Sequence, residues 1–404
     1  MTPDDSARLY AMRWTGEWVS RDLPCTSATV TDAIGAPGGC TVDIEPQHAD
    51  LTDERGLPVF REWDTLLFVE ESGQLRGGGI LTRATASGDS LRLECDGFTA
   101  LPQGAPLDTT IQWGGKTDGR TGNGVDPADV VRALWDHFQA QPDSNLGVVV
   151  DDISTPYRLG EWVNAAGTDN EETLPIDRVW SGHDDRPKAR KGKTLYWRYI
   201  LAWHDDVEIG RTIDDVCSQA GLEYREEISW GDADKETVHF RLALGYPRLG
   251  HRRANLAFVE DVNVVGPVEV QRDGTSFANA VIAYGSGEGS KQLRAYANRR
   301  DGRLRRYATV DASDVTEKAT LQAIADAELR KLQHTEDISR IEVMEHPNAA
   351  RGTFHAGDDI LIHVGPGWAQ TSLWVRILSM DTDLDSGATT IDCTRSDSFD
   401  YWRH

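Results

Sequence analysis

The chain has 404 residues with 66 acidic and 42 basic side chains, and its formal net charge is -24. At about 100 to 200 residues for each domain, this length excludes a single small fold and predicts two to four domains. Such an acidic chain repels nucleic-acid phosphates, which disfavours tight DNA binding. No stretch approaches the roughly 20 apolar residues that cross a bilayer, and the acidic N-terminus differs from a signal peptide. We therefore expect neither membrane insertion nor conventional secretion.

Strand and turn signals dominate the first hundred residues. Three apolar or alternating runs, at 65–69, 79–83 and 91–95, are separated by short segments that contain Gly and Ser. Such runs joined by tight turns predict a β-meander. The Pro- and Gly-rich interval after Leu101 ends the pattern, so we place a first, barrel-like β-domain at residues 1–108.

The first strong helix is predicted at 126–141. Asp126 can cap it, Pro127 occupies the first helical position, and an apolar residue recurs every four positions. Acids far outnumber bases from 143 to 185, which predicts strands joined by acidic, exposed loops. We assign residues 109–205 to an α+β insertion domain.

A second helix is predicted at 208–220, because its apolar residues align on one side and Gly221 follows as a C-cap. Two strands, at 222–230 and 237–244, then flank a short Gly- and Asp-containing turn. We assign residues 206–264 to a helix plus β-hairpin domain.

The last domain is predicted at 265–404. Alternating residues at 258–270 and an apolar run at 280–284 predict strands that lead into it. Ser313 can cap an amphipathic helix at 313–334. The apolar side of this helix, which we expect to pack on the strands that follow, comprises Leu321, Ile324, Leu329 and Leu332. Those strands are predicted at 338–345, 359–364, 373–380 and 388–393. The whole chain is therefore predicted to be β-rich α+β and multidomain, with barrel-like β-domains at both ends and α+β domains between them.

No motif for catalysis or metal binding is complete. The run Asp381, Asp383, Asp385 has the spacing of a calcium loop, but Ser386 replaces the required glycine and Asp392 replaces the bidentate glutamate. His183-Asp184-Asp185 and His204-Asp205-Asp206 pair an imidazole with carboxylates without metal-ligand spacing. The glycine-rich stretches at 114–117 and 285–289 fit neither a phosphate loop nor a nucleophile elbow.

The five cysteines are scattered and predict reduced, mostly buried thiols. We predict no catalytic residue, no metal, no cofactor and no enzymatic activity.

Two basic clusters stand out from the acidic background, at 186–193 and 299–306. Their basic residues are Arg186, Lys188, Arg190, Lys191 and Lys193 in the first, and Arg299, Arg300, Arg303, Arg305 and Arg306 in the second. Both can be solvated turns, or patches that dock an acidic surface of a neighbouring subunit. DNA contact is the weaker alternative, because each cluster is short and has few aromatic neighbours.

Tryptophan is unusually frequent, at 13 residues. Tryptophan serves both as an interface anchor and as a core residue. The residues that crowd the middle of the chain are Trp162, Trp180, Trp197, Trp203 and Trp230. We expect most of them to lie in the core.

Several segments together carry a family resemblance. They are NAVIAYGSGEG (279–289), TLQAIADAELRKL (320–332), IEVMEHP (341–347), FHAGDDILIHV (354–364), WVRILSMDTDLDSGATTIDCT (374–394) and the early hairpin GGGILTRATASGDSLRLECDGFTALPQG (77–104). With the helix and hairpin unit at 208–244, they resemble the hub or minor tail proteins at the tail tip of long-tailed bacteriophages. The similarity covers about two thirds of the chain and includes no catalytic motif.

The resemblance implies a structural virion protein at the tail tip, made in the host cytoplasm. It implies a homotrimer in which two barrel-like domains of each subunit close into a ring around the tail axis. The implied partners are the distal tail protein, the tape-measure protein and other tail-tip or fibre proteins. DNA would pass through the ring during ejection without specific binding. Because the chain stops at His404, soon after its last predicted strand, we expect a hub without an appended hydrolase.

Two other functions remain open from the sequence. One is a module that binds carbohydrate on a phage or cell surface, and the other is a cell-wall hydrolase whose catalytic pair lies among the 66 acids. Sugar release would indicate the hydrolase, and glycan binding without turnover would indicate the module.

Overall fold

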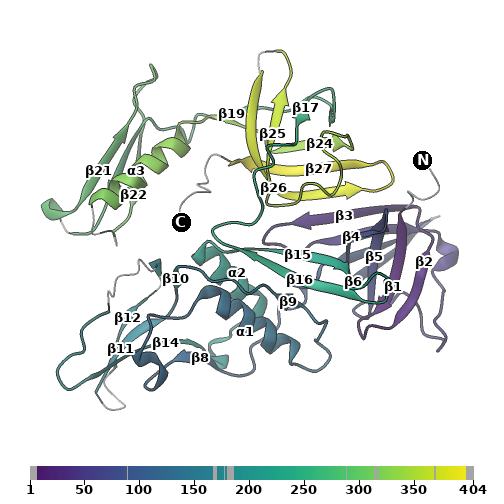
Figure 1. Ribbon diagram of the computed structural model, residues 1–404, viewed down its shortest axis with the longest axis horizontal. Coiled ribbons are helices and arrows are strands. Elements are labelled where there is room, and N and C mark those ends of the chain that lie inside the picture. Colours follow the sequence, from purple (N-terminus) through teal and green to yellow (C-terminus); the bar gives the residue numbers. More distant parts are fainter. Residues whose placement is uncertain are drawn as a thin grey trace. The chain divides into compact units, whose positions relative to one another are not determined.

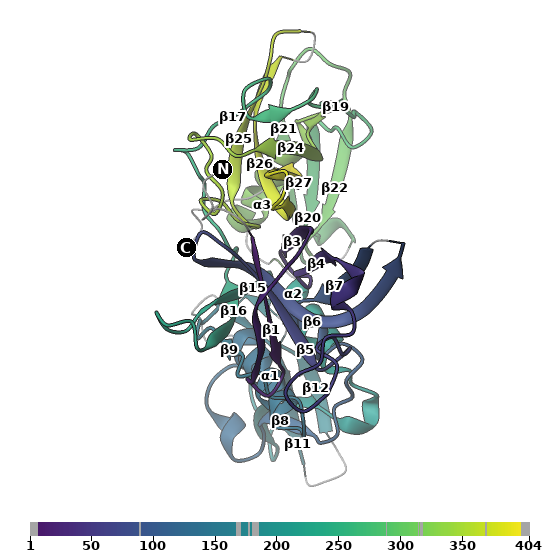
Figure 2. The same ribbon diagram turned by 90° about the vertical axis from the view of Figure 1, so that its right-hand side faces the viewer.

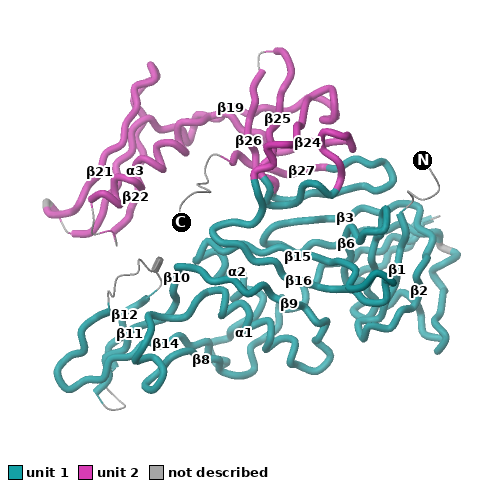
Figure 3. The backbone as a smooth tube through the Cα atoms, in the orientation of Figure 1, with its two compact units in different colours: residues 1–251, 352–358, 378–389 teal, residues 252–351, 359–377, 390–404 magenta. Residues whose placement is uncertain are grey.

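The computed structural model describes residues 7–88, 90–166, 171–176, 178–179, 186–287, 289–313, 315, 318–367 and 370–396. The chain forms two compact units (Figure 3), of which the first comprises residues 1–251, 352–358 and 378–389. The second comprises residues 252–351, 359–377 and 390–404. The protein is thus β-rich α+β and multidomain, as predicted. No helix in these described ranges has the length and apolar character that crossing a membrane requires.

The first unit begins with an antiparallel sheet whose strand order is β3-β4-β7-β6-β5-β1-β2 (Figure 1). The strands are β1 (Arg8–Arg13), β2 (Trp18–Leu23), β3 (Ser27–Ala33), β4 (Gly39–Ile44), β5 (Thr65–Glu71), β6 (Gln74–Ser87) and β7 (Ser90–Asp96). The end of β26 (Thr371–Asp383) adds to β3, with Ser379 opposite Ala33 and Asp383 opposite Thr29. The predicted meander corresponds to β5, β6 and β7, whereas β1 to β4 carry no pattern that we recognised.

Strands β1 and β5 of this sheet are buried on both faces, which explains why β5 reads as an apolar run rather than as an alternating strand. Leu9 and Leu67 pack into one cluster of buried side chains, and Tyr10 and Phe68 pack into another. Neighbouring strands approach closely at Gly79, where an added Cβ atom would lie 2.2 Å from the carbonyl oxygen of Asp96. Glycine is therefore required at this position of β6.

A helix and hairpin layer covers one of these faces within the first unit. It contains α1 (Pro127–Gln139), α2 (Ile209–Ala220) and a small sheet of β15 (Glu223–Trp230), β16 (Val238–Gly245) and β9 (Val149–Val150). Phe240 joins the layers, because its ring centroid lies 6.0 Å from that of Phe68 and 5.9 Å from that of Phe98. The helix boundaries agree with the caps read from the sequence: Asp126 accepts a hydrogen bond from the Ala128 backbone N–H, and Gly221 is left-handed.

The rest of the first unit is a four-stranded antiparallel sheet ordered β12-β11-β14-β8. Its strands are β8 (Ile111–Gly114), β11 (Glu161–Ala165), β12 (Glu171–Pro175) and β14 (Thr194–Leu201). A further strand pair consists of β10 (Tyr157–Arg158) and β13 (Arg178–Val179). Short 3-10 helices lie at η1 (Pro46–His48), η2 (Phe98–Ala100), η3 (Asp118–Arg120) and η4 (Trp203–Asp205).

The second unit contains strands in the order β18-β24-β27-β26, with β25 pairing both β26 and β17. These strands are β17 (Phe258–Val259), β18 (Val264–Val265), β24 (Arg340–Met344), β25 (Asp359–Val364), the first part of β26, and β27 (Ala388–Arg395). The strand signal expected at 258–270 corresponds to two short strands, β17 and β18, because the chain turns between them. Asn263 stabilises this turn: its side chain accepts from the Val259 N–H at 2.8 Å and donates to the Ala257 carbonyl at 2.9 Å.

The second unit also holds a small α+β element (Figure 2). Its sheet has the order β21-β20-β22, with β20 (Ala280–Tyr284), β21 (Arg294–Asn298) and β22 (Tyr307–Asp311), and α3 (Lys318–Leu332) covers one face. The remaining elements of the unit are η5 (Gly289–Lys291) and the pair of β19 (Gln271–Arg272) with β23 (Glu336–Asp337).

Helix α3 differs from its prediction in two respects. It begins at Lys318 rather than after Ser313, because Val315 belongs to a preceding turn, in which it donates to the Ala312 carbonyl and accepts from the Ser286 N–H. Leu321 and Leu329 are buried, but they pack on β20 and β21, which precede the helix, rather than on the strands that follow it. Ile324 and Leu332 are partly buried in the same cluster.

Candidate functional site

The second basic cluster is a loop that joins β21 to β22 across the start of β20. Asn279, only 2% exposed, organises this loop. Its side-chain amide donates to Asp301 Oδ1 and to the Leu304 carbonyl, both at 3.2 Å, and its Oδ1 accepts from the Arg306 N–H at 2.9 Å. Its backbone carbonyl accepts from the Arg299 N–H at 2.9 Å. One buried side chain therefore fixes the conformation of the loop from within.

The five arginines of this loop do not have the same role. Arg305 donates to the Asn279 carbonyl at 2.9 Å, and Arg299 donates to Gln333 Oε1 at 2.8 Å just after α3. Arg306 donates to the Thr275 carbonyl at 3.4 Å. Arg303 lies 4.5 Å above the Phe277 ring and 3.7 Å from Asp301. Arg300 is exposed and has no ion-pair partner among the described residues.

The first basic cluster, at 186–193, lies in the first unit beside β11 and β14. The Arg186 guanidinium lies 5.5 Å from the centre of the Trp162 ring and donates to the Arg120 carbonyl. Arg190 pairs with Glu172 at 2.7 Å, and Lys193 lies 4.0 Å from the same carboxylate. Lys188 and Lys191 are exposed. Part of this cluster therefore secures its own loop, and the two lysines face solvent.

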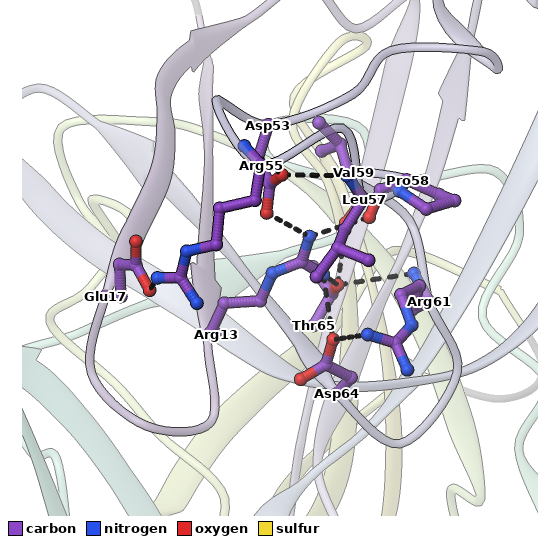
Figure 4. Close-up of polar contacts among 10 residues, drawn as sticks. All are labelled: Arg13, Glu17, Asp53, Arg55, Leu57, Pro58, Val59, Arg61, Asp64 and Thr65. Carbon is purple, nitrogen blue, oxygen red and sulfur yellow. Dashed lines mark hydrogen bonds and ion pairs between the residues drawn. The ribbon is translucent and has the colours of Figure 1, made fainter.

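A buried arginine fixes the long loop between β4 and β5 (Figure 4). Arg13 pairs with Asp53 at 3.0 Å and with Asp64 at 2.9 Å, and it also donates to the Thr65 hydroxyl at 3.0 Å and to the Pro58 carbonyl at 2.7 Å. These contacts come from the middle of the loop and from the end that leads into β5. Arg13 therefore fixes this part of the loop, on which Trp63 is largely exposed and has a left-handed backbone with φ of 59°.

Glu226 of β15 joins the hairpin to the first sheet. Its carboxylate accepts from the Gly38 N–H at 3.2 Å, from the Thr99 N–H at 2.5 Å and from the Thr99 hydroxyl at 2.6 Å. Gly97 leaves room for it, because an added Cβ atom there would lie 1.9 Å from Glu226 Oε2. Burial of the carboxylate raises the pKa of Glu226 to about 7, against the lowering effect of the three hydrogen bonds.

The candidate calcium run is a hairpin turn. Asp381 accepts from the Thr31 hydroxyl at 2.6 Å, Asp383 accepts from the Asp385 N–H, and Asp392 pairs with Arg340 at 2.6 Å. These carboxylates point to different partners. Within the described ranges, no three His, Cys, Asp or Glu residues lie close enough together to hold a metal ion.

The other candidate chemistry gives no assembled site. His204 is exposed and lies 3.9 Å from Asp205, and 183–185 fall outside the described residues. Burial raises the pKa of the Cys217 and Cys393 thiols to about 12. A thiol with so high a pKa is protonated at neutral pH and is a poor nucleophile. All five cysteines are free thiols.

Most tryptophans of the middle segment serve the core. Trp162 and Trp197 are buried, and Trp230 packs 5.2 Å from the Tyr10 ring. Trp203 is largely exposed on η4, and Trp180 lies outside the described residues. Sequence reasoning missed Asn279, Glu226 and Arg13, because no local pattern distinguishes a polar residue that is buried from one that faces solvent.

Comparison with known proteins identifies the class of fold. No protein-family model and no curated protein sequence matches the chain. Among solved structures, the fold is similar to that of a prophage tail protein. The 43 kDa tail protein of prophage MuSo2 from Shewanella oneidensis matches 98% of this chain and 100% of its own, with a TM-score of 0.53 and 10% identity.

Two further tail proteins are similar at lower scores. The tail protein from Neisseria meningitidis MC58 has a TM-score of 0.48 and 13% identity, and covers 97% of this chain and 97% of its own. Prophage tail protein gp18 from Listeria monocytogenes has a TM-score of 0.49 and 11% identity, and covers 95% of this chain and 94% of its own. At the level of fold, the resemblance read from the sequence is confirmed, and the Shewanella protein alone carries that conclusion.

Proposed function

We propose that this chain is a structural protein of a phage tail tip, a hub that surrounds the tail channel and links the tail tube to the tip. The observation that supports this most directly is the likeness to a prophage tail protein over 98% of this chain and 100% of the other. A likeness of this extent involves more than one common module. Because a fold alone does not define a function, the role requires a test in the virion.

In this proposal three copies form the ring. The barrel-like segments 1–108 and 265–404 of each copy supply its wall, and segments 109–205 and 206–264 extend from it. The sheet of the first unit suits such a wall, because its strands β1 and β5 are buried on both faces and a close-packed interior resists deformation. The distal tail protein, the tape-measure protein and other tail-tip or fibre proteins are the expected neighbours.

DNA would pass the ring without a specific site. The formal charge of -24 on each copy repels phosphates, and the two basic clusters use much of their hydrogen bonding within the chain. Repulsion would therefore prevent the DNA from being retained during ejection.

The protein would act without catalytic turnover. The raised thiol pKa values and the dispersed carboxylates of the described residues support this. Asp206→Asn, which removes the best described carboxylate beside a histidine, should therefore leave infectivity within about twofold of wild type, as for an exposed substitution away from any site. Release of sugar from cell walls by the purified protein, abolished in this variant, would favour the hydrolase instead.

Localisation in the virion tests the proposal. An affinity tag on this chain should appear in purified tails, and gold-labelled antibody should mark the tail tip in electron micrographs. Tails that lack the chain, or label on the capsid, would contradict the proposed function.

A further inference from the structure

The small sheet of the second unit has one covered face and one open face. Val281, Ala283, Ala295 and Ala297 are buried on the side of α3. Side chains of a strand alternate between faces, so the residues between them point away from the helix. On this open face Tyr296 and Tyr307 are 55% and 69% exposed.

The register brings the exposed tyrosines to the same part of the sheet. Ile282 of β20 lies opposite Tyr296 of β21, and Ala280, two residues earlier, lies opposite Tyr307 of β22. Tyrosines are rigid, amphipathic side chains that supply contact area at low entropic cost, and they are enriched in protein interfaces. The open face is therefore suited to protein contact.

The basic loop continues this face at the end where Tyr307 begins β22. Leu304, in the middle of the loop, is 89% exposed, and Arg300, earlier in the loop, is also exposed. The hydrogen bonds of Asn279 to Asp301 and to the Leu304 carbonyl hold the loop in this conformation. Binding would thus lose little conformational freedom, which favours affinity.

The charge of the loop is opposite to that of the rest of the chain. Residues 299–306 contain five arginines and one aspartate, which gives +4. With -24 for the whole chain, all other residues together carry -28. The remainder of a second copy therefore carries a large excess of acidic side chains, and opposite charges speed and orient association.

We infer that the open face and the basic loop, comprising Tyr296, Tyr307, Arg300, Arg303 and Leu304, form a docking surface for an acidic surface of a second copy of this chain. Leu304 and the tyrosines supply apolar contact, and the arginines select an acidic partner. The inference rests on the proposed function in one respect: assembly of the tail brings copies of this chain into contact. Arg299, Arg305 and Arg306 hold the loop rather than the partner.

A photo-crosslink in assembled tails tests the partner. The chain is produced with benzoylphenylalanine in place of Tyr307, assembled into tails in the phage host and irradiated. We expect a covalent dimer of this chain, joined to a peptide rich in Asp and Glu. A crosslink to a different tail protein, or tails that contain the chain but give no crosslink, would overturn the inference.

Charge reversal tests the mechanism in the same tails. Arg300→Glu combined with Leu304→Ser should reduce the Tyr307 crosslink about tenfold or more, as for loss of interface anchor residues. Both side chains are exposed, so thermal unfolding should be unchanged. The control is Arg211→Glu on α2, whose side chain is 77% exposed, and it should change the crosslink less than about twofold. An equal crosslink in both variants would overturn the inference, whereas absence of the wild-type chain from tails would overturn the proposed function.

Discussion

Glu226→Gln tests how the hairpin is joined to the first sheet. The substitution keeps the shape of the side chain but removes its charge and its titration. In the wild type, the ionised carboxylate accepts bonds from Gly38 and Thr99, while burial penalises its charge and the nearby Asp32 carboxylate adds to this penalty. Arg225 lies 4.0 Å from Asp32 and bonds to Glu227 at 2.7 Å, so its charge is engaged by these neighbouring carboxylates.

The direction of the pH effect follows from the raised pKa. Burial raises the pKa of Glu226 from 4.5 to about 7, so between these values the folded protein binds a proton that the unfolded chain releases. The free energy of unfolding therefore falls as pH rises through this window. At about 1.4 kcal/mol for each pH unit, this one group lowers the free energy of unfolding by roughly 3 kcal/mol across the window. The full decrease is present above pH 7, and none of it is present below pH 4.5.

The assay compares urea unfolding of wild type and Glu226→Gln at pH 4.5 and at pH 8, followed by tryptophan fluorescence. All other titrations are common to both proteins and cancel in the difference. We expect the variant to gain roughly 3 kcal/mol relative to wild type between the two pH values. Amide exchange of peptides with Gly38 and Thr99 reports the same change locally. A difference independent of pH would refute the reasoning that burial controls this carboxylate.

Three further substitutions and one matched control test the packing within each unit. Leu321→Ala on α3 should lower the free energy of unfolding by about 2 to 5 kcal/mol. The matched Leu304→Ala on the exposed loop should change it by no more than about 0.5 kcal/mol. Equal changes in chemical denaturation would show that the helix is misplaced. Arg13→Met should release the loop between β4 and β5, because Asp53 and Asp64 lose their buried partner, and such a loss costs several kcal/mol. Chymotrypsin cleavage after Trp63 should become at least about tenfold faster. An unchanged cleavage rate would refute the role of Arg13 in fixing the loop. Asp126→Ala should lower the free energy of unfolding by more than the loss of an ordinary N-cap, which is about 1 kcal/mol. The reason is that Asp126 also accepts a hydrogen bond from the Thr155 N–H at 2.7 Å. A smaller loss would contradict this.

The elements best predicted from sequence are those whose ends are coded locally. Helix α1 has Asp126 and Pro127 at its start, and α2 has Gly221 at its end. The strand-turn-strand pattern of β5 to β7 is coded in the same way. In each of these cases the deciding residues lie within a few positions of one another.

Elements whose limits depend on distant contacts were less predictable. The start of α3 is delayed by a turn that bonds to Ser286, about 30 positions before it. Strand β1 shows no alternating pattern, because both of its faces are buried, one of them by the helix and hairpin layer far along the chain. Single-sequence periodicity carries no information about such coverage.

The candidate sites show the same division. Composition was sufficient to find the two basic clusters, but it could not separate Arg305, which bonds to Asn279, from Arg300, which faces solvent. Whether an arginine holds its own loop or is available to a partner depends on three-dimensional neighbours. The aspartates near 381–392 also acquire their roles from distant partners such as Thr31 and Arg340.

A reconstruction of the intact tail by electron cryo-microscopy tests the proposed hub most directly. Fitting this fold into the density should yield three copies around the tail axis at the tip, with segments 1–108 and 265–404 lining a continuous channel. Density for this chain at the tip with any symmetry other than three-fold, or a channel wall built without these two segments, would contradict the hub.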